Sequence, residues 1–171
     1  GNFLAGQMPV GLGGLTGLNQ LFLDRNSLEG SIPVEIGNLV NLFDLNLWGN
    51  DLVGSIPPEL GNLSQLISLS LDYNHLTGSI PPELTNLTTL HWLNLAGNDL
   101  TGSIPMGFGG FSDLMWFGMN DNQFAGPIPS DLGTLPNLRE LHLEGNNLTG
   151  EIPPELGGIA TLEFLLLGGN D

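Results

Sequence analysis

The chain has 171 residues, of which 18 are acidic and two are basic, so its formal net charge is −16 at pH 7. Such an acidic surface repels phosphate backbones and anionic lipids, which argues against nucleic acid as a partner and favours cationic ligands. The absence of cysteine excludes disulfides, thiol catalysis and zinc–thiolate sites, and no apolar run reaches the ~20 residues of a membrane span.

The chain repeats every 24 residues without an insertion or deletion. After each of the first seven repeated asparagines, a glycine follows by four residues and a proline by seven. Self-similarity at this period indicates stacked coils, and we predict one solenoid domain over residues 1–171. The repeated asparagines are Asn2, Asn26, Asn50, Asn74, Asn98, Asn122, Asn146 and Asn170.

Within a unit, the pattern changes from that of a strand to that of a turn. In the unit 42–65, leucines alternate with other residues over 42–47, which predicts a strand with one buried face. The Pro-Pro-Glu-Leu-Gly-Asn stretch at 57–62 predicts a short 3₁₀ or helical turn. The asparagine lies where the strand bends away, and we expect its amide to hydrogen-bond the backbone of neighbouring coils inside the protein.

The consensus LxxLxLxxNxLxGxIPxxLGxL, present in about seven consecutive units, resembles the plant-type subclass of the leucine-rich repeat family. The resemblance implies an α/β solenoid with a parallel β-sheet on the concave face, 3₁₀ or short helical turns on the convex face, and a second short strand around LxGxIP. It also implies an extracellular or cell-surface setting and a protein or peptide ligand, as in receptor-kinase ectodomains; polygalacturonase inhibitors carry similar arrays.

Three features depart from the family pattern. The chain begins and ends at the same phase of the repeat without caps or paired cysteines, so we expect a longer polypeptide, or alternatively head-to-tail self-association. Peptide receptors of the family often hold a ligand carboxylate with two arginines, but Arg25 and Arg139 lie in units 1 and 6. In the fifth unit, apolar consensus positions are filled by other bulky residues, for which we expect a repacked core: Phe108, Phe111, Phe117 and Met119.

The candidate ligand site consists of outward positions on the predicted strands, where aromatic side chains lie beside carboxylates. Aromatic residues on a rigid surface are typical anchors for a partner. Alternatively, Trp92 and Trp116, which are neighbours in one column, only pack on each other. Aromatic faces beside carboxylates also suit sugars. The predicted ligand-binding residues are Asp44, Trp48, Asp72, Tyr73, Trp92, Trp116, Glu140, His142 and Glu144.

Glu140, His142 and Glu144 alternate on one strand, but consecutive Cα atoms would be ~6.6 Å apart, which is too stretched for one ion. We therefore expect no metal and no cofactor. Three Asn-Leu-Ser/Thr sequons predict N-glycosylation at Asn62, Asn86 and Asn147.

No nucleophile–base set, phosphate loop or pair of catalytic carboxylates has a convincing spacing, so we expect a non-enzymatic recognition module. The alternative is a structural protein that stacks end to end or coats a surface. Carbohydrate binding and ice binding are weaker alternatives, the latter because Thr77, Ser79, Thr101 and Ser103 form a regular hydroxyl array.

Overall fold

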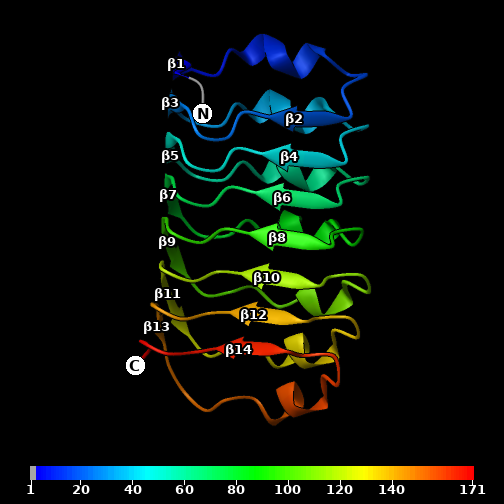
Figure 1. Ribbon diagram of the computed structural model, residues 1–171, viewed down its shortest axis with the longest axis vertical. Coiled ribbons are helices and arrows are strands. Elements are labelled where there is room, and N and C mark those ends of the chain that lie inside the picture. Colours follow the sequence, from blue (N-terminus) through cyan, green and yellow to red (C-terminus); the bar gives the residue numbers. More distant parts are fainter. Residues whose placement is uncertain (1–2) are drawn as a thin grey trace.

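The computed structural model describes residues 3–171 and is a stack of coils with one strand facing front in each (Figure 1). We call these strands the front sheet; it is seven-stranded and parallel. Partners are 24 residues apart, as in Asp44↔Ser68 and Ser68↔Trp92, which confirms the predicted columns. The strands are β2 (Gln20–Phe22), β4 (Asp44–Asn46), β6 (Ser68–Ser70), β8 (Trp92–Asn94), β10 (Trp116–Gly118), β12 (Glu140–His142) and β14 (Phe164–Leu166).

A second parallel sheet, which we call the side sheet, runs along one edge of the stack and confirms the expected short strand around LxGxIP. The helical turns lie mostly behind the front sheet in Figure 1, which places them on the convex side. The side strands are β1 (Ala5–Gln7), β3 (Ser27–Gly30), β5 (Asp51–Gly54), β7 (His75–Gly78), β9 (Asp99–Gly102), β11 (Gln123–Gly126) and β13 (Asn147–Leu148). The 3₁₀ turns are η1 (Val10–Gly14), η2 (Val34–Asn38), η3 (Pro58–Asn62), η4 (Pro82–Asn86), η5 (Phe108–Gly110), η6 (Ser130–Thr134) and η7 (Pro154–Gly158).

The repeated asparagines form the predicted internal ladder, apart from Asn2, which lies outside the described residues. Asn74, 5% exposed, donates its amide N–H groups to the carbonyls of Leu71 in its own coil and Leu47 in the previous coil, at 3.0 and 3.1 Å. Its Oδ1 accepts the backbone N–H of Leu52 at 3.2 Å. One side chain therefore satisfies backbone groups of two coils at the bend, which no strand partner can reach.

Leucine and isoleucine columns fill the space between the front sheet and the turns, and most of these side chains are fully buried. The bulky residues of the fifth unit join this core: Phe108 packs edge-to-face on Phe111 and Phe117, with ring centroids 5.3 and 5.2 Å apart. These three phenylalanines and Met119 are 0% exposed, which confirms the expected repacking.

The spacing of the convex turns depends on a glycine that contacts the next coil. A Cβ atom on Gly61 would lie 2.4 Å from the backbone oxygen of Glu83 in the next coil. The equivalent glycines of four other coils would meet the next coil in the same way: Gly13, Gly37, Gly109 and Gly133. The turns therefore pack at a distance that only glycine allows.

Thr85 occupies this glycine position in η4, and the next coil changes to make room for it. Residue 107 is glycine where all the other coils except the first have an acid, and it adopts φ 117°, a conformation that favours glycine. The following turn η5 is only three residues long, and the amides of Gly107 and Gly109 donate to the Asp131 carboxylate at 2.7 and 3.2 Å. Thr85 thus accounts for the irregular turn of the fifth unit.

We predict that Gly61→Ala lowers the free energy of unfolding by about 2–3 kcal/mol, because the added methyl group overpacks the turn. Gly157→Ala is the matched control, because Gly157 has the same place in its coil but no atom within 4 Å of an added Cβ. Urea unfolding followed by circular dichroism measures both. Equal effects of the two substitutions would contradict the packing argument.

Candidate functional site

The front sheet contains a shallow hollow of about 250 Å³ over its second to fourth strands, β4, β6 and β8. Trp48 and Trp92 stand on either side of it, while the coil between them contributes only the small side chains of Ser68 and Ser70 together with Asp72. Asn46 and Asn94 complete the lining. Two large aromatic residues separated by a coil of small residues therefore create the hollow.

Asp72 supplies the negative charge of the hollow. It is 6% exposed, and within residues 3–171 its carboxylate accepts a hydrogen bond from its own backbone amide and from no other residue. Burial raises the pKa of Asp72 to about 6, an effect that this hydrogen bond partly offsets. Burial also raises the pKa of the half-buried Asp44, offset in part by a hydrogen bond from Ser68, which lines the hollow.

Each tryptophan of the hollow has one ring face covered by the protein. The Arg25 guanidinium carbon lies 4.2 Å from the centroid of the Trp48 ring, a cation–π contact. Trp92 stacks on Trp116 with centroids 4.4 Å apart and planes inclined by 10°. Neither Arg25 nor Trp116 lines the hollow. The hollow is therefore lined by the indole surfaces of Trp48 and Trp92 that Arg25 and Trp116 do not cover.

The stack continues away from the hollow, where His142 lies on Trp116 with centroids 4.4 Å apart. Gly118 leaves the space for this arrangement, since a Cβ atom there would be 2.9 Å from Trp116 Nε1. The His142 Nε2 atom lies 3.0 Å from Glu140, and its Nδ1 atom lies 3.7 Å from Glu144. The two carboxylates use different nitrogens of the ring, and no group of three metal-ligating side chains occurs within residues 3–171.

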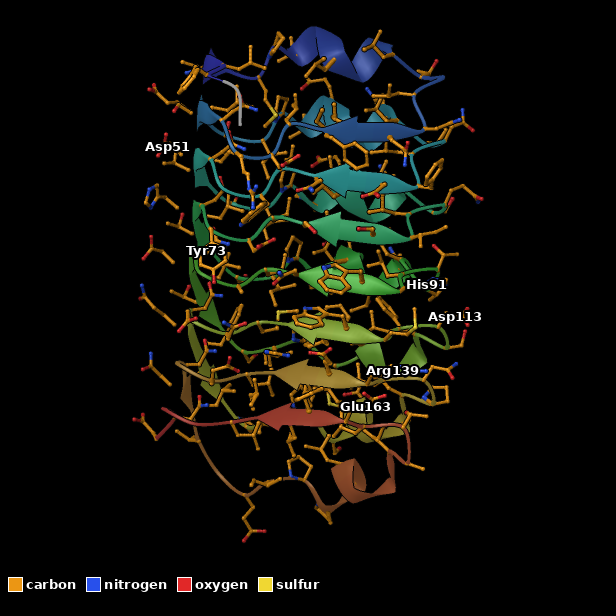
Figure 2. All side chains as sticks on the ribbon, viewed as in Figure 1. Asp51, Tyr73, His91, Asp113, Arg139 and Glu163 are labelled. Atoms are coloured by element: carbon orange, nitrogen blue, oxygen red, sulfur yellow. The ribbon has the colours of Figure 1, made fainter. Side chains whose placement is uncertain are left out.

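Tyr73 lies at the edge of the front sheet beyond the C-terminal end of β6, as Figure 2 shows, and does not line the hollow. It is 57% exposed and has φ 52°, which is costly for a residue other than glycine. Its ring covers Gly97 in the next coil, where a Cβ atom would be 2.8 Å from Tyr73 Cδ1. The same pairing of a side chain that has positive φ with a glycine in the next coil occurs at Arg25 with Gly49 and at Asp121 with Gly145.

The structure thus brings three predicted residues, Trp48, Asp72 and Trp92, together around one hollow, with Asp44 adjacent through Ser68. It gathers Trp116, Glu140, His142 and Glu144 in a separate cluster. The prediction omitted Asn46, Ser68, Ser70 and Asn94. Ser68 shares an outward column with Trp92, and the other three share the next outward column, which is the only signal that the sequence offers for them.

The three sequon asparagines are all exposed: Asn62 and Asn86 end consecutive convex turns, and Asn147 begins β13. Glycosylation at these positions stays a prediction. Within the described residues, no helix combines the length and apolar character required to cross a lipid bilayer.

Comparison with protein families finds five matches to the family described as Leucine Rich Repeat, at residues 17–39, 41–63, 65–87, 89–111 and 137–159. These matches do not include residues 113–135, which contain Phe117 and Met119 of the repacked core. No curated protein sequence matches the chain.

Among solved structures, the chain is similar to the plant peptide hormone receptor RGFR1, solved in complex with RGF2, with 40% identity and a TM-score of 0.97 over 99% of this chain and 27% of the receptor chain. The Arabidopsis receptor kinase HAESA, solved with the peptide hormone IDA and the co-receptor SERK1, gives 40% identity and a TM-score of 0.96 over 99% and 28%. A plant ice-binding protein gives 31% identity and a TM-score of 0.80 over 98% and 62%. The chain therefore spans little more than a quarter of these receptor chains.

We predict that Asp72→Asn stabilises the protein at neutral pH by about 1–2 kcal/mol, because it removes a buried and poorly paired charge. The raised pKa means that the folded state binds the proton more tightly than the unfolded state, so this group costs stability as pH rises from 3.8 to about 6. The difference between variant and wild type in urea unfolding should be small at pH 4 and largest above pH 7.

Asp113→Asn is the control for net charge, because Asp113 is exposed at the opposite edge of the front sheet from Tyr73 (Figure 2). It should change stability little at either pH. Destabilisation by Asp72→Asn above pH 7 would show that the carboxylate is well paired in the folded protein, contrary to the assignment of Asp72 as a poorly paired charge.

Proposed function

The chain belongs to the leucine-rich repeat family, and on that premise we propose that it is a non-enzymatic recognition module that binds a peptide or protein segment on its concave front sheet. The hollow between Trp48 and Trp92 carries the proposal, because it combines free aromatic surface with a buried carboxylate that lacks a partner side chain. The similar receptors with bound peptide hormones support the same class of ligand.

The form of the front sheet favours an extended ligand. Its strands pair with one another through the stack, so a ligand meets side chains, not free strand edges. The outward columns near the hollow offer hydroxyl, amide and carboxylate groups over three successive coils. A peptide laid along the stack could exchange hydrogen bonds with each of these coils while an anchor side chain enters the hollow.

By analogy with the receptor ectodomains, we place the module outside the cell or at its surface, where the exposed sequon asparagines would be available for glycosylation. The proposal includes no catalytic step, because the serines that line the hollow have no histidine beside them in its lining to act as a base.

Ice binding is a second candidate, favoured by the similarity to the plant ice-binding protein. Thr77, Ser79, Thr101 and Ser103 are all exposed on or next to the side sheet. The hydroxyl array does not continue through the stack, however: Val53 and Ala125 replace the threonines in the adjacent coils, and Pro127 and then Glu151 replace the serines toward the C-terminus. An extended flat lattice of hydroxyl groups is therefore less developed here than the aromatic hollow of the front sheet.

We predict that random peptides displayed on phage and selected on the immobilised chain bind the front sheet. Trp92→Ala should then lower the affinity for the selected peptides about tenfold or more, because it removes an anchor residue. Phe43→Ala is the matched control, because Phe43 is 37% exposed just before β4 but does not line the hollow. Circular dichroism verifies that both variants fold. Peptides that bind Trp92→Ala as tightly as wild type would contradict the proposal.

The same preparations separate the competing functions. Thermal hysteresis that disappears in Thr101→Val, without any peptide selected on the front sheet, would favour ice binding. Larger species in light scattering as concentration rises would favour end-to-end assembly, for which the end coils offer exposed apolar residues such as Leu15 and Leu165. A monomer that captures peptides through Trp92 supports recognition.

A further inference from the structure

The hollow contains one group whose chemistry the protein itself leaves incomplete, the Asp72 carboxylate. A buried carboxylate is costly unless a cation or several hydrogen bonds compensate it. Among the described residues, Asp72 accepts only its own backbone amide, and no arginine or histidine lies in the lining of the hollow. A ligand that brings a positive charge would complete this site.

The walls of the hollow suit a flat cation. Indole rings attract cations over their faces within about 6 Å, and guanidinium groups are preferred because they are planar and weakly hydrated. The protein contains an internal example of this contact, since Arg25 lies 4.2 Å over one face of Trp48. The indole surfaces of Trp48 and Trp92 that line the hollow offer the same contact to a ligand from outside.

The remaining lining groups suit a peptide backbone. Asn46 Oδ1 accepts the amide of Trp48 at 3.1 Å, and Asn94 Oδ1 accepts the amide of Ala96 at 3.2 Å. The Nδ2 groups of both asparagines have no partner within residues 3–171, so two amide donors remain for carbonyl oxygens of a ligand. Amide donors for carbonyl oxygens beside an acceptor for a cation match one basic residue of a peptide. A neutral sugar could donate hydroxyl groups to Asp72 but would leave its negative charge uncompensated.

Resting on the proposed function, we propose that the hollow is the subsite for one arginine side chain of the ligand, with the guanidinium paired to Asp72 and stacked against Trp92 or Trp48. Asn46 and Asn94 donate to carbonyl groups of the peptide on either side of that arginine. The net charge of −16 attracts a cationic peptide to the protein and accelerates its association.

Two short peptides test the assignment, acetyl-Gly-Arg-Gly-amide and the same peptide with citrulline in place of arginine. Citrulline has nearly the same shape as arginine and no charge. We expect the arginine peptide to bind wild type about tenfold or more tightly than the citrulline peptide in an NMR titration. Equal binding of the two peptides would overturn the proposal, as would tighter binding of the corresponding lysine peptide, because a guanidinium would then have no advantage.

Asp72→Asn and Glu144→Gln form a matched pair of variants. Both remove one negative charge, and Asp72 and Glu144 share a column of the front sheet, but Glu144 lies next to His142, outside the hollow. Asp72→Asn should abolish the preference for arginine over citrulline, and Glu144→Gln should retain it. Because Asp72→Asn is expected to stabilise the fold, its loss of binding cannot come from unfolding. An equal loss in both variants would show attraction to general acidity and would overturn the subsite.

The peptide selection separates this inference from the function on which it rests. Selected peptides that depend on Trp92 but contain no arginine would overturn the arginine subsite and leave the recognition function standing. Peptides whose binding does not depend on Trp92 would overturn the recognition function itself. Selected peptides that depend on Trp92 and share an arginine would support both.

Discussion

The asparagine ladder is the interaction on which the rest of the structure depends. Each coil must bend away from the front sheet, and the bend leaves backbone donors and acceptors without strand partners. Asn74, Asn98 and Asn122 each bind carbonyls of their own coil and of the previous one, and each accepts an amide of the previous coil. Because these offsets are fixed, the coils stack in register and residues 24 positions apart become neighbours.

The register set by the ladder turns scattered residues into a surface. Trp92 meets Trp116 because both follow their asparagines at the same distance, and Ser68 lies beside Trp92 for the same reason. On the convex side, glycines such as Gly61 permit the corresponding close approach, and Thr85 shows how a substitution there shifts the next turn. The hollow therefore depends on side chains from three coils that the regular scaffold keeps at constant spacing. Among these side chains, the buried carboxylate of Asp72 lowers the stability of the fold.

The repeat made the fold and the columns predictable, since strand alternation, asparagine spacing and the proline-rich turn all follow directly from the period. Three features of the site did not follow from it. The prediction grouped Tyr73 with the tryptophans, but its side chain lies at the edge of the front sheet outside the hollow, because column membership says nothing about the direction in which a long side chain leans. The small residues Ser68 and Ser70 received no weight, although a hollow needs residues that leave space as well as residues that enclose it. The burial of Asp72 depends on its three-dimensional neighbours and could not be read from its position alone.

The central claim is that ligands enter the hollow between Trp48 and Trp92. The chain has three tryptophans, so the indole N–H resonances of a ¹⁵N-labelled sample report on the two walls and on Trp116, whose N–H is buried. Titration with the arginine peptide should shift the Trp48 and Trp92 resonances most and that of Trp116 much less. Unchanged Trp48 and Trp92 resonances at saturation, or a shift confined to Trp116, would contradict the account.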